Sequence, residues 1–484
     1  MKTAIALLRR HALTVALAIG WFLLFRAGFQ HYAGSKALYV GFSLVSLALL
    51  VNGFYRPASF SYLFLSIFLW LGFWFKLTAN FLFLGFFPFG EAVGSFDSSP
   101  QAWDQVLYVA MVASISVILA RGLLAFFGMR VYSEMRLATP PTWYPKVRRL
   151  LWLFLVLAIL AAAVLNVIYG VHQIGISPRT IFPWPTNALL AWFLNLGAAL
   201  AISILVCWDV ALRKNLVLPA YAMLGEAFLM TVSIISRAAF PFHIIPQMLA
   251  LWQRQELRQR VSKVQLLFFL AIVAIFFLTA VASVSVLRDY LYSGNRSVPV
   301  PTSPAASLAV PSTAAGTAGI VKPVASFRWI LIHQLVINRW IGIEGVMAIA
   351  SYPGKSTKLL KDMLLEKREI GKVTAYQLVS NSGYQVPDAK YQFGSMPGMA
   401  GFLYYGGSLW IVFFAMFGIV LFAVASERAV FAATANPVFC SLYGVTLANT
   451  IAQFGVTPRQ DISMFLMLYA VAGVVWVIQS SARE

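Results

Sequence analysis

Charged or titratable side chains in or beside long apolar stretches are the first candidates for chemistry in this sequence. A charge at the centre of a membrane-spanning helix costs roughly 2.5–3.5 kcal/mol, so such a residue needs a partner or a function. Arginine keeps its charge at any relevant pH and binds phosphate through two parallel, charge-assisted hydrogen bonds. The candidates that we single out among them are Arg26, Lys76, Arg237, His333, Arg339 and Glu344.

Four of these residues are cations that fall near one end of an apolar stretch: Arg26, Lys76, Arg237 and Arg339. Gathered at the membrane surface, they would suit a lipid-linked diphosphate. When the bond to such a diphosphate breaks, negative charge develops on the leaving oxygen, and a fixed cation stabilises that charge without a metal. For Arg26 and Lys76 the competing interpretation is that the long side chains reach out to the interface.

The stretch 327–354 combines aromatic residues with three polar candidates and is interrupted by glycines. His333 or Glu344 could be the base that takes a proton from an attacking sugar hydroxyl. Glu344 lies five residues after Arg339. This spacing also allows an Arg339–Glu344 ion pair, across a helical turn or a helix break, that clamps the stretch onto a membrane domain. Both interpretations remain open from the sequence.

The composition is that of an integral membrane protein. Hydrophobic residues make up 60% of the 484 residues, charged residues 11%, and the mean hydropathy is +0.79. A soluble chain carries about 25% charged residues. The net charge of +20 does not indicate nucleic-acid binding, because Lys and Arg occur in short turns between apolar runs, as cytoplasmic turns do. We find no motif for a metal or an organic cofactor, so none is expected.

Apolar runs of helix-spanning length recur along the chain, and none has the alternating pattern of a membrane strand. The sequence therefore predicts an all-α integral membrane protein of about twelve transmembrane helices. The expected spans are 12–29, 37–54, 59–78, 106–127, 150–170, 188–207, 217–235, 238–252, 266–286, 408–424, 430–449 and 462–478.

The positions of the basic turns predict the orientation. With the N-terminus in the cytoplasm, every short basic turn, including the one at Arg428, lies on the cytoplasmic side. The C-terminus is then cytoplasmic too, and the long hydrophilic segment after the ninth span is extracytoplasmic. Long loops translocate largely regardless of their charge.

Three regions follow from this pattern. Residues 1–287 form a bundle of helices 1–9, and 406–484 supply helices 10–12. Between them, 288–405 is the large loop, in which 298–324 is a Pro/Ala/Ser-rich flexible linker and 326–400 a helical cap.

Two short motifs give this topology a family resemblance. Ser236-Arg237-Ala238 precedes a short span and a basic turn, and Asn338 to Met347 reads N-R-W-x-G-x-E-x-x-M around Arg339. Together with about twelve spans and one large outer loop, they resemble the bacterial O-antigen polymerase and ligase superfamily. The resemblance implies a metal-independent, GT-C-like glycosyltransferase in the bacterial inner membrane, with its active site on the periplasmic face.

The resemblance also implies the substrate and partners. The donor would be an undecaprenyl-diphosphate-linked oligosaccharide, bound by Arg237 and Arg339 among the membrane lipids, with a chain-length regulator and a flippase of the same pathway as further partners. The ligase's late histidine motif is absent from the loop, which favours a polymerase of repeat units over a ligase that transfers finished glycan to a lipid acceptor. A polysaccharide flippase or other transporter is the alternative from another class, and it would be expected to show internal repeats.

Overall fold

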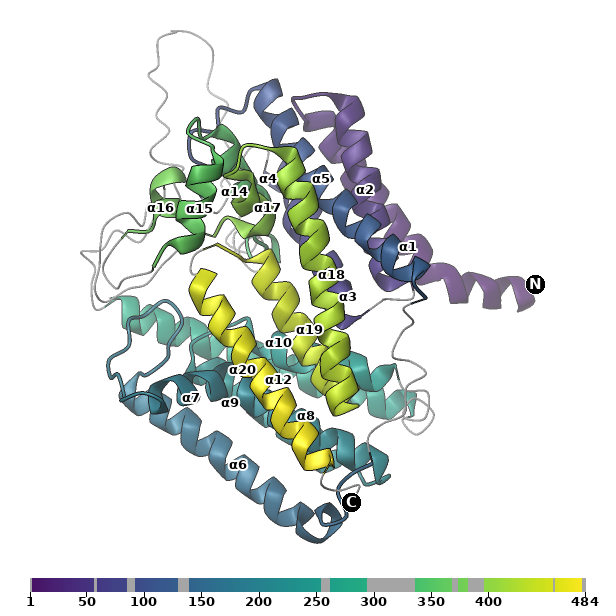
Figure 1. The fold of residues 1–484 in the computed structure, drawn as a ribbon. Helices are drawn as coiled ribbons and strands as arrows, with labels where there is room; N and C mark the ends of the chain where they lie inside the picture. Colours follow the sequence, from purple (N-terminus) through teal and green to yellow (C-terminus); the bar gives the residue numbers. More distant parts are fainter. Residues whose placement is uncertain are drawn as a thin grey trace.

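The structure, a computed structural model, is built of helices (Figure 1). It describes residues 2–55, 59–84, 92–128, 139–253, 262–293, 336–367, 373–381, 396–455 and 458–480. No strand occurs within these ranges. The prediction of an α-helical membrane protein is therefore confirmed at the level of fold class. The proposed linker 298–324 lies outside the described residues.

Seven helices or continuous helix series within the described ranges are long and apolar enough to cross a membrane. Two of these series contain a π-helical turn, η1 and η3. The seven are α2 (Lys36–Phe54), α3–η1–α4 (Phe60–Trp70, Leu71–Phe75, Lys76–Leu84), α5 (Pro100–Phe126), α6 (Tyr144–Tyr169), α7–η3–α8 (Thr186–Trp192, Phe193–Gly197, Ala198–Ala211), α12 (Lys263–Ser293) and α18 (Leu409–Thr434).

Shorter apolar helices occupy the other expected spans. They are α1 (Lys2–His31), α9 (Val217–Ser233), α10 (Ala239–Trp252), α19 (Pro437–Ala452) and α20 (Pro458–Ser480). Each expected apolar run thus overlaps a helix, although these five have described apolar stretches shorter than the seven above.

One expected helix boundary is wrong. The turn predicted at Arg428 is absent, because α18 continues to Thr434 and α19 begins only at Pro437. The break is made by Ala435, which adopts the left-handed conformation (φ 44°), and by Asn436, whose side chain accepts hydrogen bonds from the first turn of α19. Asparagine before proline is a strong helix-start signal, and it outweighs the single charge at 428.

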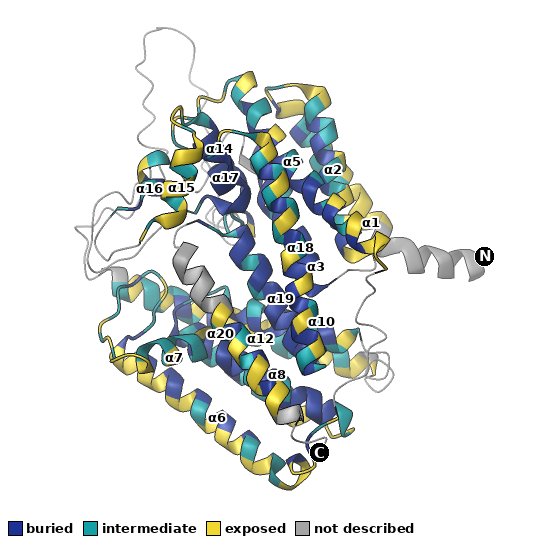
Figure 2. Ribbon diagram, in the orientation of Figure 1, coloured by how far each residue is buried: buried dark blue, intermediate teal, exposed yellow. Residues whose placement is uncertain are grey.

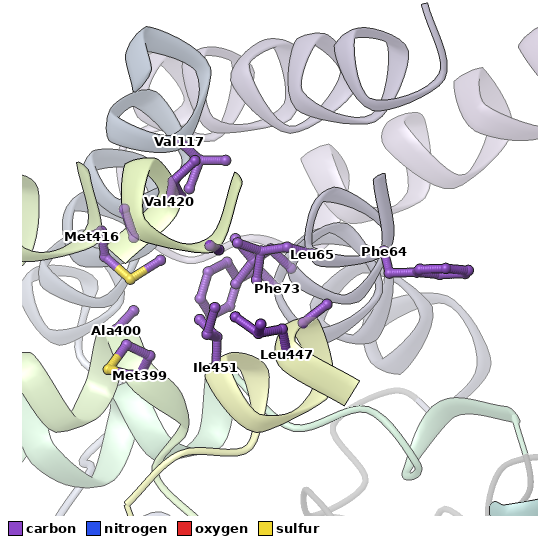
Figure 3. Close-up of a cluster of buried hydrophobic side chains, with 14 of the residues drawn as sticks. Phe64, Leu65, Phe73, Val117, Met399, Ala400, Met416, Val420, Leu447 and Ile451 are labelled. Atoms are coloured by element: carbon purple, nitrogen blue, oxygen red, sulfur yellow. The ribbon is translucent and has the colours of Figure 1, made fainter. Parts of the chain in front are cut away.

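The helix series α3–η1 is the centre of the molecule. Of its spanning window 72% is buried inside the protein, against 11% for α12. Phe73 and Leu65 pack against side chains of α5, α17, α18 and α19 (Figure 3). The buried carboxylate of Glu427 accepts hydrogen bonds from the backbone N–H groups of Phe60 (2.8 Å) and Ser61 (2.6 Å), which fixes the start of α3 to α18.

The buried side chains form two main clusters. One unites α2, α3, α5, α14, α17, α18 and α19, and the other unites α6, α8, α9, α10 and α12. Helix α19 joins the halves, since it packs against α3 on one side and against α10 and α8 on the other.

The hydrophilic region after α12 contributes four short helices: α14 (Ile343–Ser351), α15 (Thr357–Leu365), α16 (Ala375–Val379) and α17 (Gly398–Tyr404). Helices α14 and α17 are buried and lie against α5 and α18, whereas α15 is on the surface (Figures 1 and 2). Gly345 permits this packing, because a Cβ there would overlap the carbonyl oxygen of Pro397. This part of the chain therefore enters the core as well as covering it.

Candidate functional site

Three arginines from separate parts of the chain share one electrostatic environment. Arg237 lies in the turn between α9 and α10, Arg288 near the end of α12, and Arg339 just before α14. Burial, together with the positive charges of Arg237 and Arg288, lowers the pKa of the Arg339 guanidinium to about 10. The group is still charged at neutral pH, and the two side-chain charges that act on it are both positive. We call Arg237, Arg288 and Arg339 the arginine cluster.

The turn that carries Arg237 is held in an unusual conformation. Ile235 has a φ of 58°, in the left-handed region that a β-branched residue rarely adopts. Its carbonyl oxygen accepts hydrogen bonds from Nε (3.2 Å) and Nη2 (2.9 Å) of Arg288. The neighbouring carbonyl of Ile234 accepts one from the backbone N–H of Ile174 (2.8 Å). Such strain persists only where surrounding contacts over-determine it, and here these contacts fix the turn two residues before Arg237.

The segment that carries Arg339 is fastened to the central helix series by Trp340. The Trp340 ring stacks on Phe68 of α3, with centroids 6.2 Å apart, and Phe68 in turn contacts Phe242 of α10. The carbonyl oxygen of Trp340 accepts a hydrogen bond from Nζ of Lys76 (2.7 Å). These contacts place Arg339 at the junction of α3, α4 and α10.

Lys76 does not reach out to the interface. It is fully buried and forms an ion pair with Glu344 in the first turn of α14, which is buried as well. The Arg339–Glu344 ion pair suggested by the sequence is not formed, because Glu344 lies within the core where Lys76 reaches it. Glu344 does join the 336–351 segment to the membrane helices, but it does so through Lys76. The position of the carboxylate at a helix N-terminus is also favourable.

The π-helical turn η1 brings the 336–342 segment close to the bundle. A Cβ at Gly72 in η1 would overlap the carbonyl oxygen of Ile341, and Gly342 (φ 157°) packs directly on Phe73. A residue with a side chain at Gly72 would therefore push this segment away. Single π-helical turns recur at functional sites, and this one ends at Lys76.

The remaining predicted residues lie elsewhere. Arg26 is exposed on α1, and no contact among the described residues connects it with the arginine cluster. His333 falls outside the described residues. The charge of Arg237 therefore acts on Arg339, Lys76 and Glu344 form a buried pair joined to Trp340, and Arg26 lies apart. No group of His, Cys, Asp and Glu suitable for a metal occurs in the described ranges.

Sequence reasoning missed Arg288. Its position at the end of the ninth apolar run would place it at the same membrane boundary as Arg237, but it carries no motif. The sequence therefore assigns Arg288 to the hydrophilic region 288–405.

A second buried network holds the α9–α10 hairpin. Nδ1 of His243 lies 2.8 Å from Oε1 of Glu226, and its Nε2 lies 2.9 Å from the carbonyl oxygen of Asn195 in η3. Because a carbonyl can only accept, Nε2 carries a proton, and the His243–Glu226 bond then shares one further proton. The Asn195 side chain also contacts Nε2 of His172 (2.8 Å). His243 and Glu226 are buried, so this network positions the α9–α10 hairpin, whose turn carries Arg237.

Comparisons with known proteins do not identify a family for this chain. No protein-family model, curated protein or solved structure matches the chain.

Proposed function

We propose that the chain is an inner-membrane glycosyltransferase of the O-antigen polymerase and ligase kind, with about twelve spans, cytoplasmic termini and a periplasmic active site. In this proposal it polymerises undecaprenyl-diphosphate-linked oligosaccharide repeat units into a surface polysaccharide. Arg237 and Arg339 bind the diphosphate of the donor.

The observation that supports the proposal is that the positive charges of Arg237 and Arg288 both act on the half-buried Arg339. Among the described residues, no carboxylate lies within ion-pair distance of Arg339. Gathering like charges costs free energy and a bound anion lowers that cost, so the cluster suits a phosphate-bearing ligand. The apolar helices around the cluster suit a ligand that is itself a lipid.

The reaction requires few groups. The hydroxyl of the acceptor sugar attacks the anomeric carbon of the donor, the bond from that carbon to the diphosphate oxygen breaks, and its electron pair stays on the diphosphate. The arginines stabilise the charge that develops there. A single displacement of this kind inverts the anomeric centre. His333 and Glu344 are the candidates for the base, and Glu344 would have to exchange its contact with Lys76 to act.

The site assignment is tested by replacing Arg237 or Arg339 with Ala and with Lys, and by analysing surface glycan length in cells. We expect single-repeat glycans from all four variants, because Lys cannot replace the two-pronged contact of Arg. Arg179→Lys, in the loop between α6 and α7, is the matched control and should leave glycan length unchanged.

The same experiment separates the alternatives. Undecaprenyl-linked polymer that accumulates without reaching its acceptor would indicate a ligase. Normal glycan chains from all four variants would exclude the two arginines from the site.

A further inference from the structure

We propose that Arg288 completes the diphosphate site as its third cation, and that its charge makes the site selective for a lipid diphosphate over a lipid monophosphate. This inference rests on the proposed function. Arg288 is a positioning residue here, since it acts on the site through Ile235 and through its charge.

The geometry gives Arg288 the first of these actions. Nε and Nη2 of Arg288 both donate to the carbonyl oxygen of Ile235, at 3.2 and 2.9 Å. Ile235 is two residues before Arg237 and has a left-handed backbone, a conformation that surrounding contacts such as those of Arg288 must hold. The guanidinium has five N–H donors, and two are used on Ile235, which leaves further donors for an anion.

The second action, that of the Arg288 charge, follows from the charges of the donor and of the product. The diphosphate of a lipid-linked sugar is a diester and carries two negative charges. As the bond to the sugar breaks, the electron pair of that bond adds a third charge to the leaving group. Two arginines neutralise the donor, and a third cation matches the charge that appears in the transition state and remains on the product. The Arg288 charge acts on Arg339, and Arg288 is hydrogen-bonded to the turn that carries Arg237.

Two substitutions separate the actions. Arg288→Gln keeps a donor for the Ile235 carbonyl and loses the charge. Arg288→Lys keeps the charge, but its donors sit on one nitrogen and cannot form the two-pronged contact. The full-length protein, purified in detergent, is titrated with undecaprenyl diphosphate and with undecaprenyl monophosphate. We expect Arg288→Gln to weaken diphosphate binding about tenfold and monophosphate binding much less. We expect Arg288→Lys to retain most of the selectivity.

A third variant tests whether Arg288→Gln acts only by disturbing the turn. Glycine adopts the left-handed conformation without strain, so Ile235→Gly relaxes the turn that Arg288 holds. If Arg288→Gln acts by disturbing the turn, adding Ile235→Gly restores binding, which would overturn the role of the charge. If the charge is what matters, the double variant remains unselective.

The matched control is Arg179→Gln. Arg179 also donates to a backbone carbonyl near a helix end, that of Val167 (2.7 Å), but it is not among the charges that act on Arg339. It should bind both lipids as the wild type does. Wild-type selectivity in Arg288→Gln would overturn this inference while leaving the proposed function intact. Failure of the wild-type protein to bind undecaprenyl diphosphate would overturn both.

Discussion

Two neighbouring places in this molecule treat charge in opposite ways. At the first, Lys76 and Glu344 are both buried and neutralise each other. At the second, Arg237, Arg288 and Arg339 gather like charges, each only partly buried. Trp340 links the two places, since its carbonyl binds Lys76 and its chain neighbour is Arg339.

The buried ion pair and the arginine cluster should respond differently when one member is replaced. Removing one partner of a buried ion pair strongly destabilises the folded protein, because the other charge is left in a medium of low polarity. A cluster of like charges is the reverse case, since removing one member relieves repulsion. The pair should therefore carry stability and the arginine cluster should carry binding.

The largest effect is expected from breaking the pair. Glu344→Gln leaves Lys76 charged and buried without its carboxylate, and should cost about 3–5 kcal/mol of unfolding free energy. Thermal unfolding in detergent measures the loss. The double variant Lys76→Met/Glu344→Gln should recover most of it, because no charge is left behind. Losses that simply add would show that the two residues act independently.

A smaller effect is expected at the contact between the 336–342 segment and the bundle. Gly72→Ala places a methyl group against the carbonyl of Ile341 and should cost about 1–3 kcal/mol through overpacking. Gly41→Ala in α2 is the control, because its nearest neighbour is Sδ of Met111 at 3.9 Å. Unfolding temperatures compare the two variants. Equal effects would mean that the close approach at Gly72 carries no constraint.

The smallest effect, and one of opposite sign, is expected at the arginine cluster. Arg339→Gln removes one of three like charges and should leave stability unchanged or raise it by about 0.5 kcal/mol. The same variant should lose binding of undecaprenyl diphosphate. Destabilisation as large as that of Glu344→Gln would show that Arg339 is a structural residue, and the contrast between the two places would fail.

The sequence predicted the helices well because each apolar run is a local signal of the right length. Arg237 and Arg339 could be singled out because each is an arginine next to an apolar segment and carries a short motif, and their role in a site stays a prediction. The partner of Glu344 could not be read from the sequence. Lys76 and Glu344 are far apart along the chain, and their pairing depends on how α14 enters the bundle.

Arg288 and the turn at Ile235 were missed for a related reason. A hydrogen bond from a side chain to a distant backbone carbonyl leaves no pattern in the sequence. The left-handed conformation at Ile235 is also unexpected, because local preference for isoleucine argues against it. Contacts between distant segments decide both features.

The link between Glu427 and the start of α3 has a consequence for how the protein is made. Synthesis begins at the N-terminus, so the N–H groups of Phe60 and Ser61 emerge long before the carboxylate that binds them, 367 and 366 residues later. The central helix must enter the membrane with those groups satisfied by other partners, and it exchanges them only when α18 arrives. A chain that stops before α18 therefore cannot assemble the core, even though it already contains all three arginines.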